Sequence, residues 1–115
     1  MKIIAREVIG ANAISMQSGQ HIYELIAKPL LGGETVEVDF DSVELFASPF
    51  FNASIGLLIK DVNINELKQR LVITNLNPVG KQLLNHVIAN AIKFYEKEAN
   101  ADENLQIIIK NAEDR

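Results

Sequence analysis

The chain has 115 residues, of which 48% are hydrophobic, and its 11 basic and 15 acidic residues leave a net charge of −4. This length is typical of one domain with a single core, and the apolar fraction excludes a disordered chain. The absence of cysteine excludes disulfide scaffolds, iron–sulfur clusters and cysteine nucleophiles, and the acidic balance argues against binding to nucleic-acid phosphates.

The first half of the chain switches between two hydrophobic periods. Apolar residues predict a strand over Lys2–Ile9 and a second, short strand over Ala13–Met16. A period of about 3.6 residues then predicts a helix over Ser18–Leu31, with Ser18 as its N-cap. Strict alternation of apolar and polar residues predicts the next strand at Thr35–Phe40.

The second half repeats this order. A helical stripe predicts a helix over Ser48–Val62, and a short apolar run predicts a strand over Arg70–Asn75. Asn77 followed by Pro78 is typical of a helix start and predicts a helix that continues to about Glu98. The apolar run Leu105–Lys110 indicates a last, buried strand, and we expect the polar tail Asn111–Arg115 to be frayed.

Alternating strands and helices define the expected fold. We expect a single α/β domain over residues 1–115, a sandwich in which a mixed sheet of four or five strands is covered by about three helices. Functional residues on such sheets lie where strands end and helices begin. This rule directs attention to residues 40–51 first and to residues 75–80 second.

The expected location of the chain follows from missing signals. The N-terminal residues carry charges at Lys2, Arg6 and Glu7 and include no apolar run of signal-peptide length. The uncharged stretch at residues 45–59 is shorter than the roughly 20 apolar residues that a membrane span needs. We therefore expect a cytoplasmic protein without membrane or nucleic-acid partners.

Ser48 and Pro49 mark the start of the predicted second long helix. Serine is a preferred N-cap and proline suits the first turn, so capping alone accounts for both residues. A second interpretation adds a switch at Ser48. A phosphoryl group would bring about −1.5 to −2 charges to a helix N-terminus that tolerates anions, and it would repel a partner bound there.

Residues 34–61, with VEVDFDSVELFASPFFNASIGLLIKD at their centre, carry a resemblance to a known family. The shared pattern is Val38-Asp39-Phe40, then Val43, then Ser48-Pro49-Phe50 and Gly56. On these residues the chain resembles the STAS-like domain family of unknown function, which is similar in plan to the STAS domains of anti-sigma-factor antagonists. The resemblance implies a STAS-like sandwich and carries no catalytic consensus.

The antagonists imply a partner as well. In them, a partner ATPase of the histidine-kinase-like type phosphorylates a serine at the start of the equivalent helix, and phosphorylation releases the complex. The resemblance therefore implies a protein partner of this type and phosphorylation at Ser48. The chain departs from the antagonists at Ala47, where they usually have aspartate, and at Pro49-Phe50-Phe51, where a small Ser-Gly pair is usual.

Three phenylalanines in six residues, Phe46, Phe50 and Phe51, indicate a candidate partner-binding surface. Either all three pack under the adjacent loops, or an exposed Phe46 or Phe50 anchors a partner. The candidate partner-binding residues are Asp41, Phe46, Ser48, Pro49 and Phe50. The function that this composition and resemblance favour is a non-enzymatic regulatory interaction module without catalytic residues.

The alternative function is binding of a small ligand or nucleotide at the helix N-termini that begin at Ser48 and Asn77. Asn77, Gly80 and Lys81 are its candidate residues, although they lack the spacing of a phosphate-binding loop.

We expect no metal and no cofactor. An acidic cluster lacks the spacing of a calcium loop, and two isolated histidines supply too few zinc ligands. These residues are Glu37, Asp39, Asp41, Glu44, His21 and His86.

Overall fold

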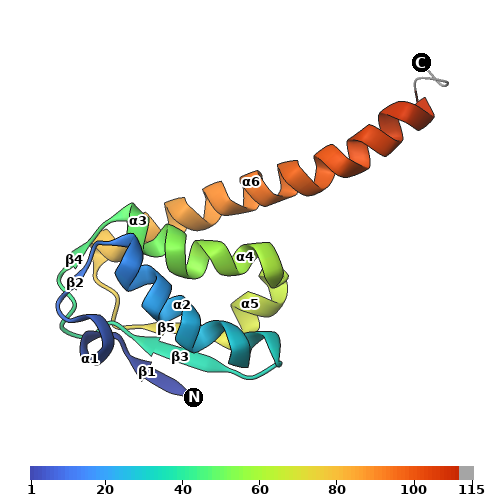
Figure 1. Cartoon of the computed structure of the whole chain (residues 1–115). Coiled ribbons are helices and arrows are strands. Elements are labelled where there is room, and N and C mark those ends of the chain that lie inside the picture. The colour runs from blue at the N-terminus through green and yellow to red at the C-terminus, as the bar shows by residue number, and fades with distance from the viewer. Residues whose placement is uncertain (112–115) are drawn as a thin grey trace.

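The computed structural model describes the backbone of residues 1–111 and the side chains of residues 1–95. Three parallel strands form its main sheet, in the order β1-β3-β5 (Figure 1). The strands are β1 (Lys2–Ile4), β3 (Val36–Asp39) and β5 (Leu71–Thr74). Parallel pairing requires a crossover between consecutive strands, and the helices of this chain supply those crossovers.

Helices cover one face of this sheet. The first crossover contains α2 (Met16–Leu31), and the second contains a long helical segment, residues 48–61, followed by α5 (Ile64–Arg70). That segment is divided into α3 (Ser48–Phe51), the π-helical η1 (Asn52–Gly56) and α4 (Leu57–Asp61). The last helix, α6 (Pro78–Asn111), packs on α3, η1 and α4 and then extends beyond the body of the molecule (Figure 1).

Alternation along β3 explains which face is buried. Val36 and Val38 are almost fully buried toward the helices, as is Phe40 directly after the strand. The side chains between them, Glu37 and Asp39, point to the opposite face, since successive residues of a strand alternate. The predicted alternation at Thr35–Phe40 is thus confirmed.

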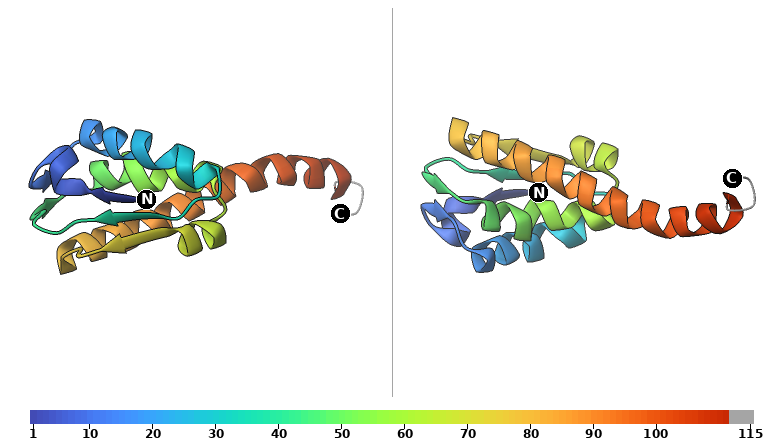
Figure 2. Two further views of the ribbon diagram at one scale, coloured as in Figure 1. Left: turned by 90° about the horizontal axis from the view of Figure 1, so that it is seen from below. Right: turned by 90° about the horizontal axis from the view of Figure 1, so that it is seen from above.

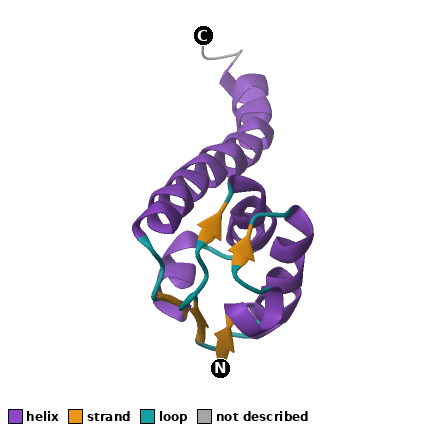
Figure 3. Ribbon diagram, turned by 90° about the vertical axis from the view of Figure 1, so that its left-hand side faces the viewer, coloured by secondary structure: helices purple, strands orange, loops and turns teal. Residues whose placement is uncertain are grey.

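A second, two-stranded sheet lies at one end of the molecule. It pairs β2 (Asn12–Ala13) with β4 (Leu45–Phe46), and α1 (Ala5–Ile9) connects β1 to it. Figure 3 views the molecule from this end. The strand predicted over Lys2–Ile9 therefore ends at Ile4, and β2 comes one residue earlier than the predicted strand at Ala13–Met16.

The predicted sheet of four or five mixed strands was wrong. Among the described residues there are two separate sheets of three and two strands, with parallel pairs only, and more helices than the expected three. Residues 105–110, predicted as a strand, belong to α6. Residues 81–111 contain neither glycine nor proline, so no strong helix breaker separates this apolar run from the preceding helix. Residues 112–115 of the predicted frayed tail lie outside the described residues.

Two predicted N-caps were also wrong. The cap of α2 is Ser15, whose hydroxyl accepts a hydrogen bond from the Ser18 N–H at 3.0 Å. At α3 the extended conformation continues through Ala47, because its N–H donates to the Ala13 carbonyl at 3.0 Å. Ala47 therefore occupies the N-cap position without a side-chain hydrogen bond, and Ser48 is the first helical residue.

Candidate functional site

The end of the molecule that carries β2 and β4 is where α2, α3 and α6 all begin (Figures 1 and 3). Hydrogen bonds tie these segments together. The Arg6 guanidinium donates to the Ser42 carbonyl at 2.7 Å, and the Asn77 amide donates to the Glu44 carbonyl at 3.0 Å. The loop between β3 and α3 is thereby attached both to α1 and to the start of α6.

Four phenylalanines form the base of this corner. Phe40, Phe50 and Phe51 are fully buried, and Phe46 is half-buried. The Phe46 ring stacks on Phe51 with a centroid separation of 5.6 Å and an interplanar angle of 3°, and Phe40 meets its neighbours edge-on. Of the two alternatives left open for Phe50, burial is the one observed, because packing against α2 and the other rings covers this candidate partner-binding residue. Phe46 alone of the two candidate anchors retains exposed surface.

Exposed apolar side chains lie on the segments that meet at the same end of the molecule as Phe46. Leu45 is 56% exposed because alternation in β4 turns it outward where Phe46 turns inward. The other members come from the segment after β2 and from the first turns of the three helices. We call this set the corner surface: Ile14, Met16, Leu45, Pro49 and Val79. Only Pro49 was among the sequence candidates, although the alternation of Leu45 with Phe46 was a signal for Leu45.

Ser48 lies at the margin of the corner surface and is half-buried. Because Pro49 has no N–H and the Phe50 N–H donates to the Ala47 carbonyl at 3.2 Å, the first turn of α3 has few free donors for an anion. A phosphoryl group on Ser48 would thus be held weakly by the helix. Its main physical effect would be added charge beside Leu45 and Pro49. Asp41, the remaining candidate, is exposed on the same loop.

Asp39, the last residue of β3, is a structural carboxylate at the base of this loop. Its Oδ1 accepts hydrogen bonds from the Asn75 side-chain amide and from the Asp41 N–H, both at 2.9 Å. These bonds join the turns after β3 and β5, where Ser42 and Asn75 have positive φ angles of 62° and 56°. The pKa of Asp39 is lowered from its ordinary value. The largest cause is the hydrogen bond from Asn75, and the second is the hydrogen bond from the Asp41 N–H.

Two members of the acidic cluster, Glu37 and Asp39, are occupied by protein contacts. Glu37 accepts a hydrogen bond from the Thr74 hydroxyl at 2.9 Å, and Lys2 lies 3.7 Å from both Glu37 and Asp39. Among the described residues, no three His, Asp or Glu side chains gather closely enough to hold a metal ion. Within the same part of the chain, no helix has the length and hydropathy of a membrane span.

We predict that Asp39 makes stability dependent on acid pH. A carboxyl whose pKa is lowered by folding stabilises the fold fully above its unfolded pKa, and this contribution is lost as the pH falls through the folded pKa. Wild-type stability should therefore fall below about pH 3.8. Asp39→Asn should be less stable at pH 7 and should show a weaker acid dependence. Urea unfolding from pH 7 to pH 2 measures both effects.

Asp61→Asn is the matched control, since Asp61 is exposed at the end of α4. It should retain the wild-type profile. An Asp39→Asn profile that runs parallel to wild type over the whole pH range would contradict the assigned role of Asp39.

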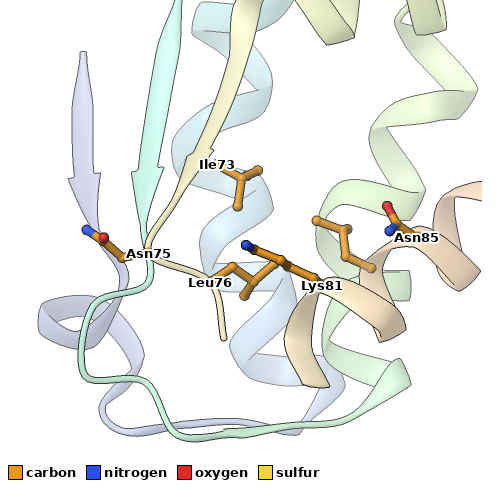
Figure 4. A pocket seen from close by; sticks show the side chains of 6 residues that line it. Ile73, Asn75, Leu76, Lys81 and Asn85 are labelled. Carbon is orange, nitrogen blue, oxygen red and sulfur yellow. The ribbon is translucent and has the colours of Figure 1, made fainter. Parts of the chain in front are cut away.

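The alternative ligand site is only partly assembled. A cavity of about 450 Å³ lies beside the end of β5, and Lys81 lines it together with Asn75 and Asn85 (Figure 4). Asn77 does not line it, because its Oδ1 caps α6 by accepting the Gly80 N–H at 2.7 Å. Gly80 is closely packed, since a Cβ there would lie 2.6 Å from Leu76 and 3.1 Å from Phe46. Asn75 was not among the candidate site residues, although its place after a strand marks it as an asparagine in a tight turn.

The fold and this corner define a class, a small α/β domain in which three helices begin around the ends of parallel strands. Residues 18–81, more than half of the chain, match the model of a family described as a STAS-like domain of unknown function. The chain belongs to this STAS-like family. The match begins within α2, includes β3, the loop to α3 and β5, and ends in the first turn of α6. No curated protein and no solved structure matches the chain.

Proposed function

We propose that this chain is a non-enzymatic regulatory module that binds a partner protein through the corner surface. The observation that carries the proposal is the exposure of Leu45, Met16 and Val79 at the end of the molecule that also holds the half-buried Phe46. Apolar side chains gathered on one end of a small domain are typical of a protein-binding site. Phe46 is already ordered by stacking on Phe51, so a partner would bury its remaining surface at little entropic cost.

The proposed partner is an ATPase of the histidine-kinase-like type, and Ser48 is the proposed regulatory residue. Membership of the STAS-like family and the position of Ser48 in the first turn of α3 support this assignment. A phosphoryl group there would place about −1.5 to −2 charges against an apolar interface, which costs several kcal/mol. Phosphorylation would therefore release the partner, while the half-exposed position of Ser48 leaves the fold intact.

A second candidate function is binding of a small anion, which the cavity beside Lys81 favours. Partner binding has the stronger support, because Asn77 and Gly80 use their polar groups within the fold and, among the described side chains, Lys81 is the one cation lining that cavity.

The test is capture of the partner from native lysate, with Leu45→Asp as the disrupting variant. Wild type should co-purify with a histidine-kinase-like ATPase, and Leu45→Asp should reduce recovery of this ATPase by about tenfold or more, because an aspartate would be buried in an apolar interface. With ATP added, the mass of the wild-type chain should increase by one phosphoryl group at Ser48, and the ATPase should be released.

Leu31→Asp is the matched control. Leu31 has the same exposed fraction as Leu45, 56%, but it lies at the opposite end of α2 from the corner surface. It should recover the ATPase as wild type does. Equal loss of the ATPase in both variants would contradict the assignment of the corner surface, and the absence of any such ATPase would refute the proposed partner.

A further inference from the structure

Among the strands that the structure describes, none pairs with the outer edge of β5. Within the described part of the chain β5 pairs with β3 alone. The Thr74 carbonyl accepts the Phe40 N–H at 2.9 Å, so the backbone groups of Thr74 face β3. Because these groups alternate along a strand, the N–H and carbonyl of Ile73 face the open edge. Figure 2 shows β5, in yellow, along one margin of the body with α5 at its start.

An apolar groove lies along this edge. Because α6 packs on α3, η1 and α4, it does not fully cover β5. The side chains of Leu71 and Ile73 are therefore only half-buried. A cavity of about 260 Å³ lies between β5, α5 and α6. It shares Ile73 and Leu84 with the larger cavity at Lys81, so the two cavities adjoin along the strand, and we call them together the β5 groove. The cavity of about 260 Å³ is lined by Ile55, Ile64, Leu67, Lys68, Leu71, Ile73, Leu84 and Ile88.

Both ends of this groove carry a lysine, although the chain has a net charge of −4. Lys68, on α5, lines the cavity near the start of β5, and Lys81, on α6, lines the cavity near its end. Both lysines are exposed. The carboxylate of Glu66 on α5 lies 3.9 Å from the Arg70 guanidinium. The groove therefore offers an apolar centre between two positive ends.

These charges argue against a second copy of the chain as the occupant. Antiparallel pairing of two β5 edges would bring Lys68 of each copy toward Lys81 of the other. Like charges facing one another across an interface are costly. An occupant with carboxylates at both ends of an apolar strand matches the groove instead.

We propose that the β5 groove binds an extended segment of a partner protein, in which alternating apolar residues are flanked by aspartate or glutamate. The segment adds a strand to β5 through the backbone of Ile73, and its apolar side chains contact Ile73 and Leu84. Its acidic ends lie near Lys68 and Lys81. Strand addition to an open sheet edge is a recurrent mode of peptide recognition. The proposal goes beyond the proposed function, because it concerns a surface separate from the corner surface.

The probe is a phage-displayed library of random peptides of about twelve residues, selected against the full chain. We expect the enriched peptides to contain alternating apolar residues between acidic ends. The best of them, made synthetically, should lose about tenfold or more in affinity when both groove lysines are reversed, in Lys68→Glu/Lys81→Glu. N-methylation of its central backbone amides should abolish binding, since the added methyl groups block strand pairing.

Lys28→Glu/Lys60→Glu is the control with the same change in net charge, because both lysines are exposed and neither lines the groove. It should bind the peptide as wild type does, and so should Leu45→Asp, which separates this proposal from the corner surface. Enrichment of no peptide, or of peptides insensitive to N-methylation or to the groove lysines, would overturn the proposal. So would a chain that dimerises through β5.

Discussion

Gly19→Ala is expected to destabilise the fold by about 2 kcal/mol. A Cβ at this position would overlap the carbonyl oxygen of Phe50 and lie 3.0 Å from the Ala53 Cβ. The oxygen cannot move freely, because the buried Ser54 hydroxyl donates to it at 2.8 Å. Overpacking of this kind costs about 1–3 kcal/mol, sometimes more, and exceeds the gain of about 1 kcal/mol that alanine brings to a helix. Urea unfolding measures the difference.

Gly32→Ala provides the control for this prediction. Gly32 has φ −79°, which alanine adopts readily, and a Cβ there would meet its nearest atom at 3.4 Å. Its free energy of unfolding should stay within about 0.5 kcal/mol of wild type. If Gly19→Ala is as stable as Gly32→Ala, the close approach of α2 to α3 is not required by the fold.

Phe40→Ala is expected to cost about 3–5 kcal/mol, a large part of the total stability of about 5–15 kcal/mol that a domain has. Phe40 is fully buried, and its ring lies 5.7 Å from Phe46 and 6.1 Å from both Phe50 and Phe51 between ring centroids. Truncation would leave a cavity at the centre of this aromatic cluster. Thermal and urea unfolding should both show the loss, together with weaker partner binding as Phe46 loses its support.

Phe94→Ala removes the same atoms from a side chain that is 56% exposed on α6. It should change the unfolding free energy by no more than about 0.5 kcal/mol. Equal losses in the two variants would show that Phe40 is not the centre of the core.

Local patterns predicted much of the fold. Strict alternation located β3, and helical periodicity located α2 and the segment 48–61, because these patterns report which face is buried. These local patterns failed where the structure depends on which segments pair as strands. Nothing in Lys2–Ile9 distinguishes Lys2–Ile4, which pairs with β3, from the α1 residues that follow, and α5 was missed altogether.

The candidate site was predicted in outline only. The loop to α3 and the residues Ser48 and Pro49 stood out in the sequence, since capping signals are local. The burial of Phe50 could not be predicted from local patterns. It depends on the close approach of α2 to the start of α3 at Gly19. The exposure of Ile14 and Val79 likewise depends on segments that meet from distant parts of the chain.

The alternating hydrophobic periods of the sequence determined, by themselves, the α/β class and a helix start at Ser48. Only the tertiary structure decided that Phe50 is buried while Leu45 is exposed, that Asp39 is held by Asn75, and that β5 has an open edge. The physical reason is the distance along the chain over which each interaction acts. Periodicity and capping act within a few residues, whereas strand pairing, helix approach and side-chain burial depend on contacts between segments far apart in the chain.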